Sequence, residues 1–157
     1  MRKQRGFTLI ELLIAAAIIL IIAAIAIPNL MSMRLGANEA SAVGSLHTYN
    51  TALSTYISTY PDLGFPSNLH DLGPASGVPD STAAGLLDNV LGCPGSRNCK
   101  KAGYRFLYSR PSAAQFKINA RPQEPGSSGR RYFYIDQTGV IRYNTTAEAS
   151  ADDVPLS

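Results

Sequence analysis

Glu11 is the residue whose position most requires an explanation. It lies in the segment 7–30, where every residue except Thr8, Glu11 and Asn29 is apolar. About 20 apolar residues in a helix span a bilayer, so this segment is a candidate transmembrane helix. A carboxylate there costs on the order of 3 kcal/mol and usually has a partner. The amine of Phe7 on an axially staggered neighbour would be such a partner and would set subunit register. The alternative is a carboxylate that reaches the membrane interface or is protonated.

Cys93 and Cys99 are the second feature with possible chemistry. They enclose the turn-rich segment 94–98. In an oxidising compartment a disulfide is the favoured interpretation, and two free thiols are the alternative. Two cysteines do not complete a tetrahedral zinc site, and neither His47 nor His70 is near them in the sequence. We interpret both histidines as surface or loop residues and predict no metal site.

No catalytic site is indicated elsewhere. The sequence has no phosphate-binding glycine loop followed by lysine, and no nucleophile motif. Asp152 and Asp153 are interpreted as part of a solvated tail rather than a cation site. Packing explains the eight tyrosines better than an electron path does. Residues 144–146 match a glycosylation triplet that is common by chance. We therefore predict a protein that is not an enzyme and has no cofactor.

The net charge of +3 is concentrated at the start of the chain. Arg2, Lys3 and Arg5 all precede Gly6, and without them 11 of the 14 basic residues remain against 11 acidic ones. The excess therefore does not form a binding surface, and no specific nucleic-acid partner is predicted. Positive charges before an apolar helix predict a cytoplasmic N-terminus, with the chain after Leu30 outside the cytoplasm.

The order of parts around Gly6 differs from that of an ordinary secretory signal, which is cleaved after its apolar stretch. Here the Gly6–Phe7 junction comes first, in the run Gly-Phe-Thr-Leu-Ile-Glu-Leu-Leu-Ile over residues 6–14. This run resembles the processing and methylation motif of type IV prepilins and type II secretion pseudopilins, and the resemblance is close over residues 2–30. It implies that a prepilin peptidase removes residues 1–6 as a leader and methylates the amine of Phe7.

The same resemblance gives roles to two further residues. Glu11 matches the acidic position that aids processing and pairs with the N-terminus of a neighbour during assembly. Pro28 matches a helix-interrupting proline, and on physical grounds we expect it to kink the helix. The implied partners are other copies of the chain in a helical filament, the prepilin peptidase and an inner-membrane assembly platform.

The rest of the sequence predicts an α+β fold of pilin type. Apolar residues at steps of three and four between Val43 and Tyr60 extend the first helix over residues 7–60, with 7–30 in the membrane or filament core. An antiparallel sheet should cover the apolar stripe around Leu46, Leu53 and Ile57. The segments expected beyond Tyr60 are a connection over 61–103 with a short helix at 81–91, strands at 104–108, 116–120, 131–135 and 140–143, and a tail over 144–157.

Three functions fit these features. The first is a pilus subunit for adhesion or motility, and the second is a major-type pseudopilin of a secretion system. A cysteine-bridged loop is more typical of pilins, whereas the region 60–69 faintly resembles major pseudopilins. Either subunit would be a single-pass inner-membrane protein before assembly into an extracellular pilus or a periplasmic pseudopilus. The third is an uncleaved anchor carrying a binding domain, which leaves Glu11 and the Gly6–Phe7 junction unexplained.

Overall fold

The computed structural model describes residues 7–93 and 98–156. Its contacts divide the chain into two compact units, Met1–Arg34 and Leu35–Ser157, which are described separately below. The elements are α1 (Leu9–Thr59), η1 (Leu69–Leu72), β1 (Asn98–Lys101), β2 (Tyr104–Ser112), β3 (Gln115–Pro122), β4 (Tyr132–Asp136), β5 (Arg142–Asn144) and β6 (Val154–Pro155).

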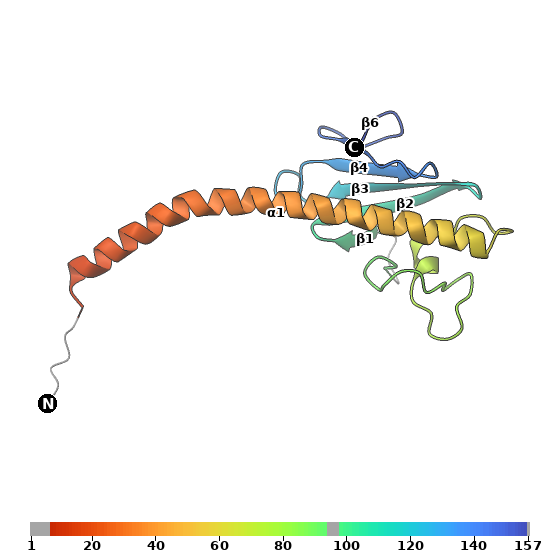
Figure 1. Cartoon of the computed structure of the whole chain (residues 1–157), viewed down its shortest axis with the longest axis horizontal. Coiled ribbons are helices and arrows are strands. Elements are labelled where there is room, and N and C mark those ends of the chain that lie inside the picture. Colours follow the sequence, from red (N-terminus) through yellow and green to blue (C-terminus); the bar gives the residue numbers. More distant parts are fainter. Residues whose placement is uncertain (1–6, 94–97, 157) are drawn as a thin grey trace. The chain divides into compact units, whose positions relative to one another are not determined.

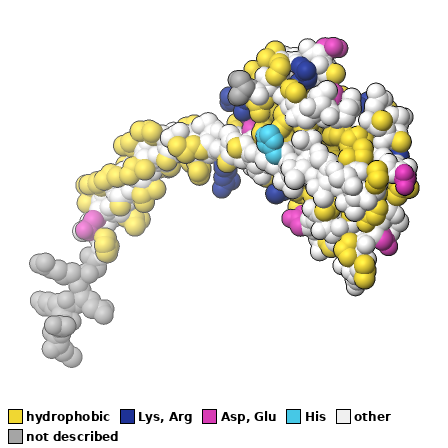
Figure 2. Space-filling model, turned by 45° about the vertical axis from the view of Figure 1, so that its right-hand side comes forward, with side chains coloured by type: hydrophobic (Ala, Val, Ile, Leu, Met, Phe, Trp, Pro, Cys, Tyr) yellow, Lys and Arg dark blue, Asp and Glu magenta, His cyan; other side chains and the backbone are white. Residues whose placement is uncertain are grey.

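The described part of the first unit consists mainly of the beginning of α1. Its side chains are exposed nearly all round, because apolar residues occupy every face of the helix instead of one stripe. Figure 2 shows hydrophobic side chains over the visible face of this segment. The helix is long and apolar enough to cross a membrane. Pro28 lies inside α1, and the helix continues through it.

The second unit is a helix-and-sheet head, which confirms the α+β prediction. Six strands form one sheet in the order β1 to β6, with every neighbouring pair antiparallel. The sheet packs on the part of α1 that belongs to this unit (Figure 1). Leu46 and Leu53 are fully buried there and Ile57 is partly buried, as the apolar stripe predicted. The largest buried side chains are Tyr49, Tyr104, Phe106, Phe133, Leu46, Leu53, Leu72, Ile118 and Ile135.

The predicted short helix at 81–91 is wrong, since this segment contains turns instead. Backbone hydrogen bonds to η1 explain the difference, because they occupy amides in the middle of the segment. The amides of Leu86 and Leu87 both donate to the carbonyl of Leu72, so they are unavailable for helical pairing. The only short helix among the described residues of this connection is η1.

Two strands were not predicted because each is short and lies at an edge of the sheet. β1 pairs with β2, and its Lys100 stands opposite Arg105. β6 has two residues and pairs with β5, so the end of the chain is not merely a solvated tail. Edge strands of this kind need the backbone hydrogen bonds of a neighbour rather than an alternating apolar pattern. The turn after β4 is closed by the Gly139 amide, which donates to the Asp136 carbonyl.

Candidate functional site

Thr8 and Glu11 form a cap at the beginning of α1. The Glu11 amide donates to Thr8 Oγ1 at 3.3 Å, and the Thr8 hydroxyl donates to Glu11 Oε2 at 3.5 Å. A side-chain oxygen in this position satisfies one of the amides that a helix leaves unpaired at its first turn. The negative charge of Glu11 also lies at the positive end of the helix dipole. The three-residue spacing from Thr to Glu is a known start signal for helices, which the sequence analysis did not use.

The carboxylate of Glu11 still has no cationic partner among the described residues of its own chain. Its side chain is exposed at the beginning of an apolar helix, and Phe7 is 83% exposed immediately before it. Such a helix end can pair with a cation from another molecule while its apolar faces enter lipid or contact other helices. The predicted cleavage residue Gly6 lies outside the described residues.

Cys93 and Cys99 form a disulfide, with their Cα atoms 5.3 Å apart. Cys99 belongs to β1, so the bond attaches the connection after α1 to the edge of the sheet. The hydroxyl of Tyr49 on α1 donates to the Leu91 carbonyl nearby. The bridge therefore stabilises a long segment that has little regular structure of its own.

Four other hydroxyl contacts show how the tyrosines act in the head. Tyr56, Tyr104 and Tyr108 donate to the backbone carbonyls of Ser81, Arg131 and Pro66, respectively. Tyr134 donates to the Asp136 carboxylate. Burial raises the pKa of each of these four hydroxyls. These residues have packing and hydrogen-bonding roles, in keeping with the interpretation of the tyrosine content.

Glu39 is a buried charge on α1. Its Oε1 accepts from the backbone amides of Arg130 and Arg131 at 2.8 and 3.2 Å, and its Oε2 accepts from Arg131 Nε at 2.7 Å. Burial by itself would raise the pKa of Glu39, but these three donors and the positive charge of Arg131 together lower it. The carboxylate therefore remains ionised and fastens α1 to the beginning of β4.

The described residues contain no group of three or more His, Cys, Asp or Glu side chains placed to hold a metal ion. His47 is exposed on α1, and His70 Nδ1 lies 3.7 Å from Asp71 Oδ1. Asp153 accepts hydrogen bonds from Asn144 and from the amide of Ser150. These contacts organise the chain locally and indicate no catalytic arrangement.

A family model and two known pilus proteins match the N-terminal segment of this chain. A family model described as "Prokaryotic N-terminal methylation motif" matches residues 1–27. The wide pilus major component PilA4 of Thermus thermophilus is 62% identical over 39 residues, which are 25% of this chain and 30% of that protein. The type IV major pilin PilA of Myxococcus xanthus is 45% identical over 56 residues, which are 36% of this chain and 26% of that protein.

A second kind of relative matches almost the whole chain. The type II secretion system core protein G of Dickeya chrysanthemi is 27% identical over 153 residues, which are 97% of this chain and 84% of that protein. The N-terminal segment of this chain is therefore similar to those of type IV pilins and type II secretion pseudopilins, and the likeness to core protein G extends over the head. Both kinds of subunit are among its relatives, and neither is preferred. The search of solved structures returned no significant match.

The segment that this chain shares with the pilins and pseudopilins is the one that carries the predicted site. The methylation motif includes Phe7, Glu11 and the apolar residues after them. The two pilus proteins match this chain over less than a third of their own lengths, so their heads are not part of the likeness. A helix that is long and apolar enough to cross a membrane agrees with this likeness.

Proposed function

We propose that this protein is a structural subunit that polymerises into a type IV pilus filament after cleavage between Gly6 and Phe7. The observation that carries the proposal is the position of the motif at the very beginning of an exposed apolar helix. Cleavage there keeps the helix as the start of the mature chain, so that the same apolar surface serves first in the membrane and then between subunits.

Glu11 gives this assembly its register. In lipid an isolated carboxylate is costly, and a methylated amine at Phe7 of the next subunit would relieve that cost. Thr8 and Glu11 are already fixed by the helix cap, which presents the carboxylate in a defined orientation. Newly inserted subunits would therefore be held by charge pairing before the apolar faces close around them.

A pseudopilin of a type II secretion system is the second candidate. The match to the core protein G of Dickeya chrysanthemi extends over the head as well as the helix and favours this function. The disulfide-bridged loop and the high local identity to a pilus component favour the first. Both functions require the same processing and the same helix packing. They differ in the location of the filament, which is extracellular for a pilus and periplasmic for a pseudopilus.

The test is the mass of the N-terminal peptide in material sheared from the cell surface. A peptide that begins at methylated Phe7 in this fraction supports the pilus proposal. The same processed peptide found only in the cell envelope, together with impaired export of folded proteins on deletion, assigns the pseudopilin function. A membrane-bound peptide that still contains Arg2 and Lys3 overturns both, and leaves the uncleaved anchor.

A further inference from the structure

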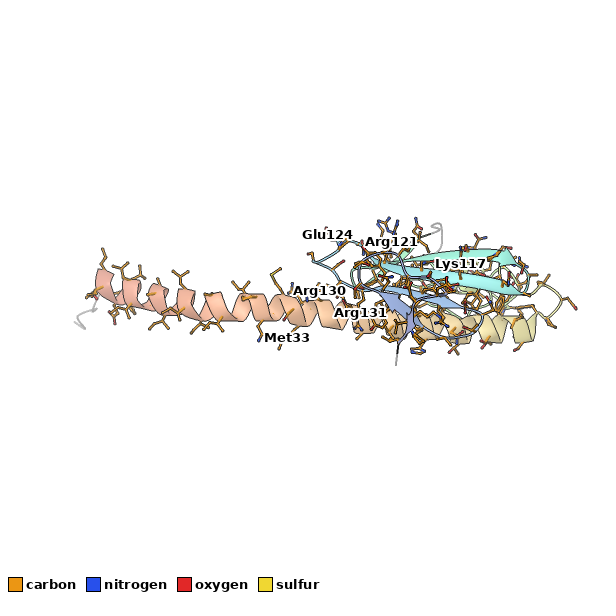
Figure 3. The ribbon with its side chains drawn as sticks, turned by 90° about the horizontal axis from the view of Figure 1, so that it is seen from above. Met33, Lys117, Arg121, Glu124, Arg130 and Arg131 are labelled. Carbon is orange, nitrogen blue, oxygen red and sulfur yellow. A yellow bond between two sulfur atoms is a disulfide. The ribbon has the colours of Figure 1, made fainter. Side chains whose placement is uncertain are left out.

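The face of the sheet turned away from α1 carries a row of cations. Side chains alternate along each strand, so Tyr104 and Phe106 are buried while Arg105 between them is only partly so. Lys100 on β1 stands opposite Arg105 on β2, which in turn stands opposite Arg121 on β3. Figure 3 shows Arg121 on the side of the sheet away from the helix. Three positive side chains thus lie side by side on adjacent strands.

Two of these cations line a hollow of about 270 Å³. Its walls are Arg105, Arg121, Pro122, Gln123, Pro125 and Tyr132. Arg105 and Arg121 are direct cross-strand partners, and like charges in such positions destabilise a sheet. Neither arginine forms an ion pair with any described residue, and the buried Nε of Arg105 has no hydrogen-bond acceptor. The hollow thus presents two guanidinium groups, which form strong charge-assisted hydrogen bonds with carboxylates and phosphates.

Another part of this face is covered by the chain itself. The Asn119 side chain donates to the Ala149 carbonyl, and Ala149 is buried. Tyr134 and Asp136 are nearly buried on the same side of β4. The C-terminal segment therefore covers Asn119 on β3 but leaves the end with Arg105 and Arg121 open. This open end is accessible to another molecule.

The chain has acidic groups suited to this hollow, but they lie elsewhere in the head. Residues 61–96 contain four aspartates and no lysine or arginine, whereas residues 97–123 contain seven lysines and arginines and no acidic residue. Asp62, Asp80 and Asp88 of the first segment are exposed. Among the described residues none of the three forms an ion pair with a cation of the chain. In the part of the head that the structure describes, no ion pair joins the acidic segment to the basic one, although Asp62 and Arg110 line a common hollow at another place in the head.

We propose that the hollow between Arg105 and Arg121 binds a carboxylate from the acidic 61–92 segment of a second copy of this chain. This inference rests on the proposed filament function and gives the heads a specific contact. The two surfaces are different parts of the head, so the contact is heterologous, and such contacts propagate into open filaments instead of closing into dimers. The row consists of only three cations, and the same head exposes three aspartates in its acidic segment. This match in charge favours a second copy of the chain over an external polyanion as the partner.

The test is a charge exchange in the full-length protein expressed in its own cells. R121E should lower the yield of sheared filaments about tenfold through like-charge repulsion. Combining R121E with one of D62K, D80K or D88K should restore the yield. The matched control is K117Q, which removes a positive charge on the same strand beyond the hollow. Lys117 stands opposite Asp136, so glutamine is used there to avoid a like-charge pair, and the yield of K117Q should remain close to that of the wild type.

A cross-linking experiment identifies the partner directly. R121K places an amine at the hollow, and a carbodiimide joins amines to adjacent carboxylates without a spacer. Linked dimers whose joined peptides contain residue 121 and Asp62, Asp80 or Asp88 support the inference.

Normal filament yield from R121E, or dimers linked only to acidic residues outside 61–92, overturns it. In either of those cases wild-type filaments with methylated Phe7 would leave the proposed function intact, so the two failures are distinguishable. Normal assembly of R121E with weaker retention on a polyphosphate resin also overturns it, in favour of an external anion.

Discussion

Arg131 and Glu39 are joined across 92 positions of sequence by a 2.7 Å contact from Nε to Oε2. The other carboxylate oxygen accepts from two backbone amides at the beginning of β4. The guanidinium also lies 5.5 Å from the ring centre of Phe133 and 5.6 Å from that of Tyr143. Together these contacts attach α1 to the middle of the sheet within the head.

Removing this carboxylate should destabilise the head. E39Q keeps the size of the side chain but removes the charge, and we expect a loss of about 2 kcal/mol because Arg131 keeps a partly buried charge without a partner. All eight tyrosines lie in the head, so near-ultraviolet circular dichroism of the full chain in detergent follows its unfolding. The double variant E39Q/R131M should recover part of the loss, and equal losses in the single and double variants would contradict the pairing.

The same residue should make the stability of the head depend on pH. The pKa of Glu39 is lowered in the folded state from its ordinary value of 4.5. A carboxylate of this kind stabilises the fold fully above its unfolded pKa and loses that effect as pH falls through the folded pKa. The melting temperature of the wild type should therefore drop below about pH 4.5 by more than that of E39Q. Parallel curves for the two proteins would argue against this assignment.

Assembly should depend on Glu11 through its charge and not only through the helix cap. E11Q removes the charge, and we expect a membrane-inserted protein with at least a tenfold lower yield of filaments because the cationic N-terminus of the neighbour loses its partner. T8V is the matched variant: it removes the cap at a cost of about 1 kcal/mol but keeps the carboxylate. Equal filament yields from E11Q and the wild type would refute a role in register.

Maturation should depend on the residue before the cleavage junction. G6L places a bulky side chain next to the bond before Phe7, and we expect accumulation of chains that retain residues 1–6, because the peptidase must approach the backbone there. Mass spectrometry of the membrane fraction measures the ratio of the two forms. Normally trimmed and methylated G6L would place the cleavage site elsewhere.

The disulfide should contribute to the stability of the head. Closing a short loop by a bond between Cys93 and Cys99 restricts the unfolded chain, which corresponds to about 2 kcal/mol on the loop-entropy model. C93S/C99S should unfold at a lower denaturant concentration than the oxidised wild type. Reduced wild type should coincide with the variant, and a reductant that changes neither protein would contradict the estimate.

The N-terminal features were predictable because their physics is local. Residues 7–30 are apolar on every face, so any helix they form is suited to lipid whatever follows them. The Gly6–Phe7 junction and Glu11 lie within a few residues of one another, and their spacing is readable directly. The cap between Thr8 and Glu11 is equally local and was missed only because the three-residue spacing was not considered.

The head is different, because tertiary structure decides which polar groups become buried or adjacent. Glu39 is a charged residue on α1, yet it is buried, and Arg130 and Arg131, just before β4, supply it with three donors. The segment 81–91 has a helical pattern, but hydrogen bonds to Leu72 hold it in turns. Arg105 and Arg121 are distant in sequence and become neighbours only through strand register. The sequence by itself determined the apolar N-terminal helix and the fold class. Strand register and long-range ion pairs, which only the tertiary structure provides, determined which charged side chains are buried in the head and which lie together on its surface.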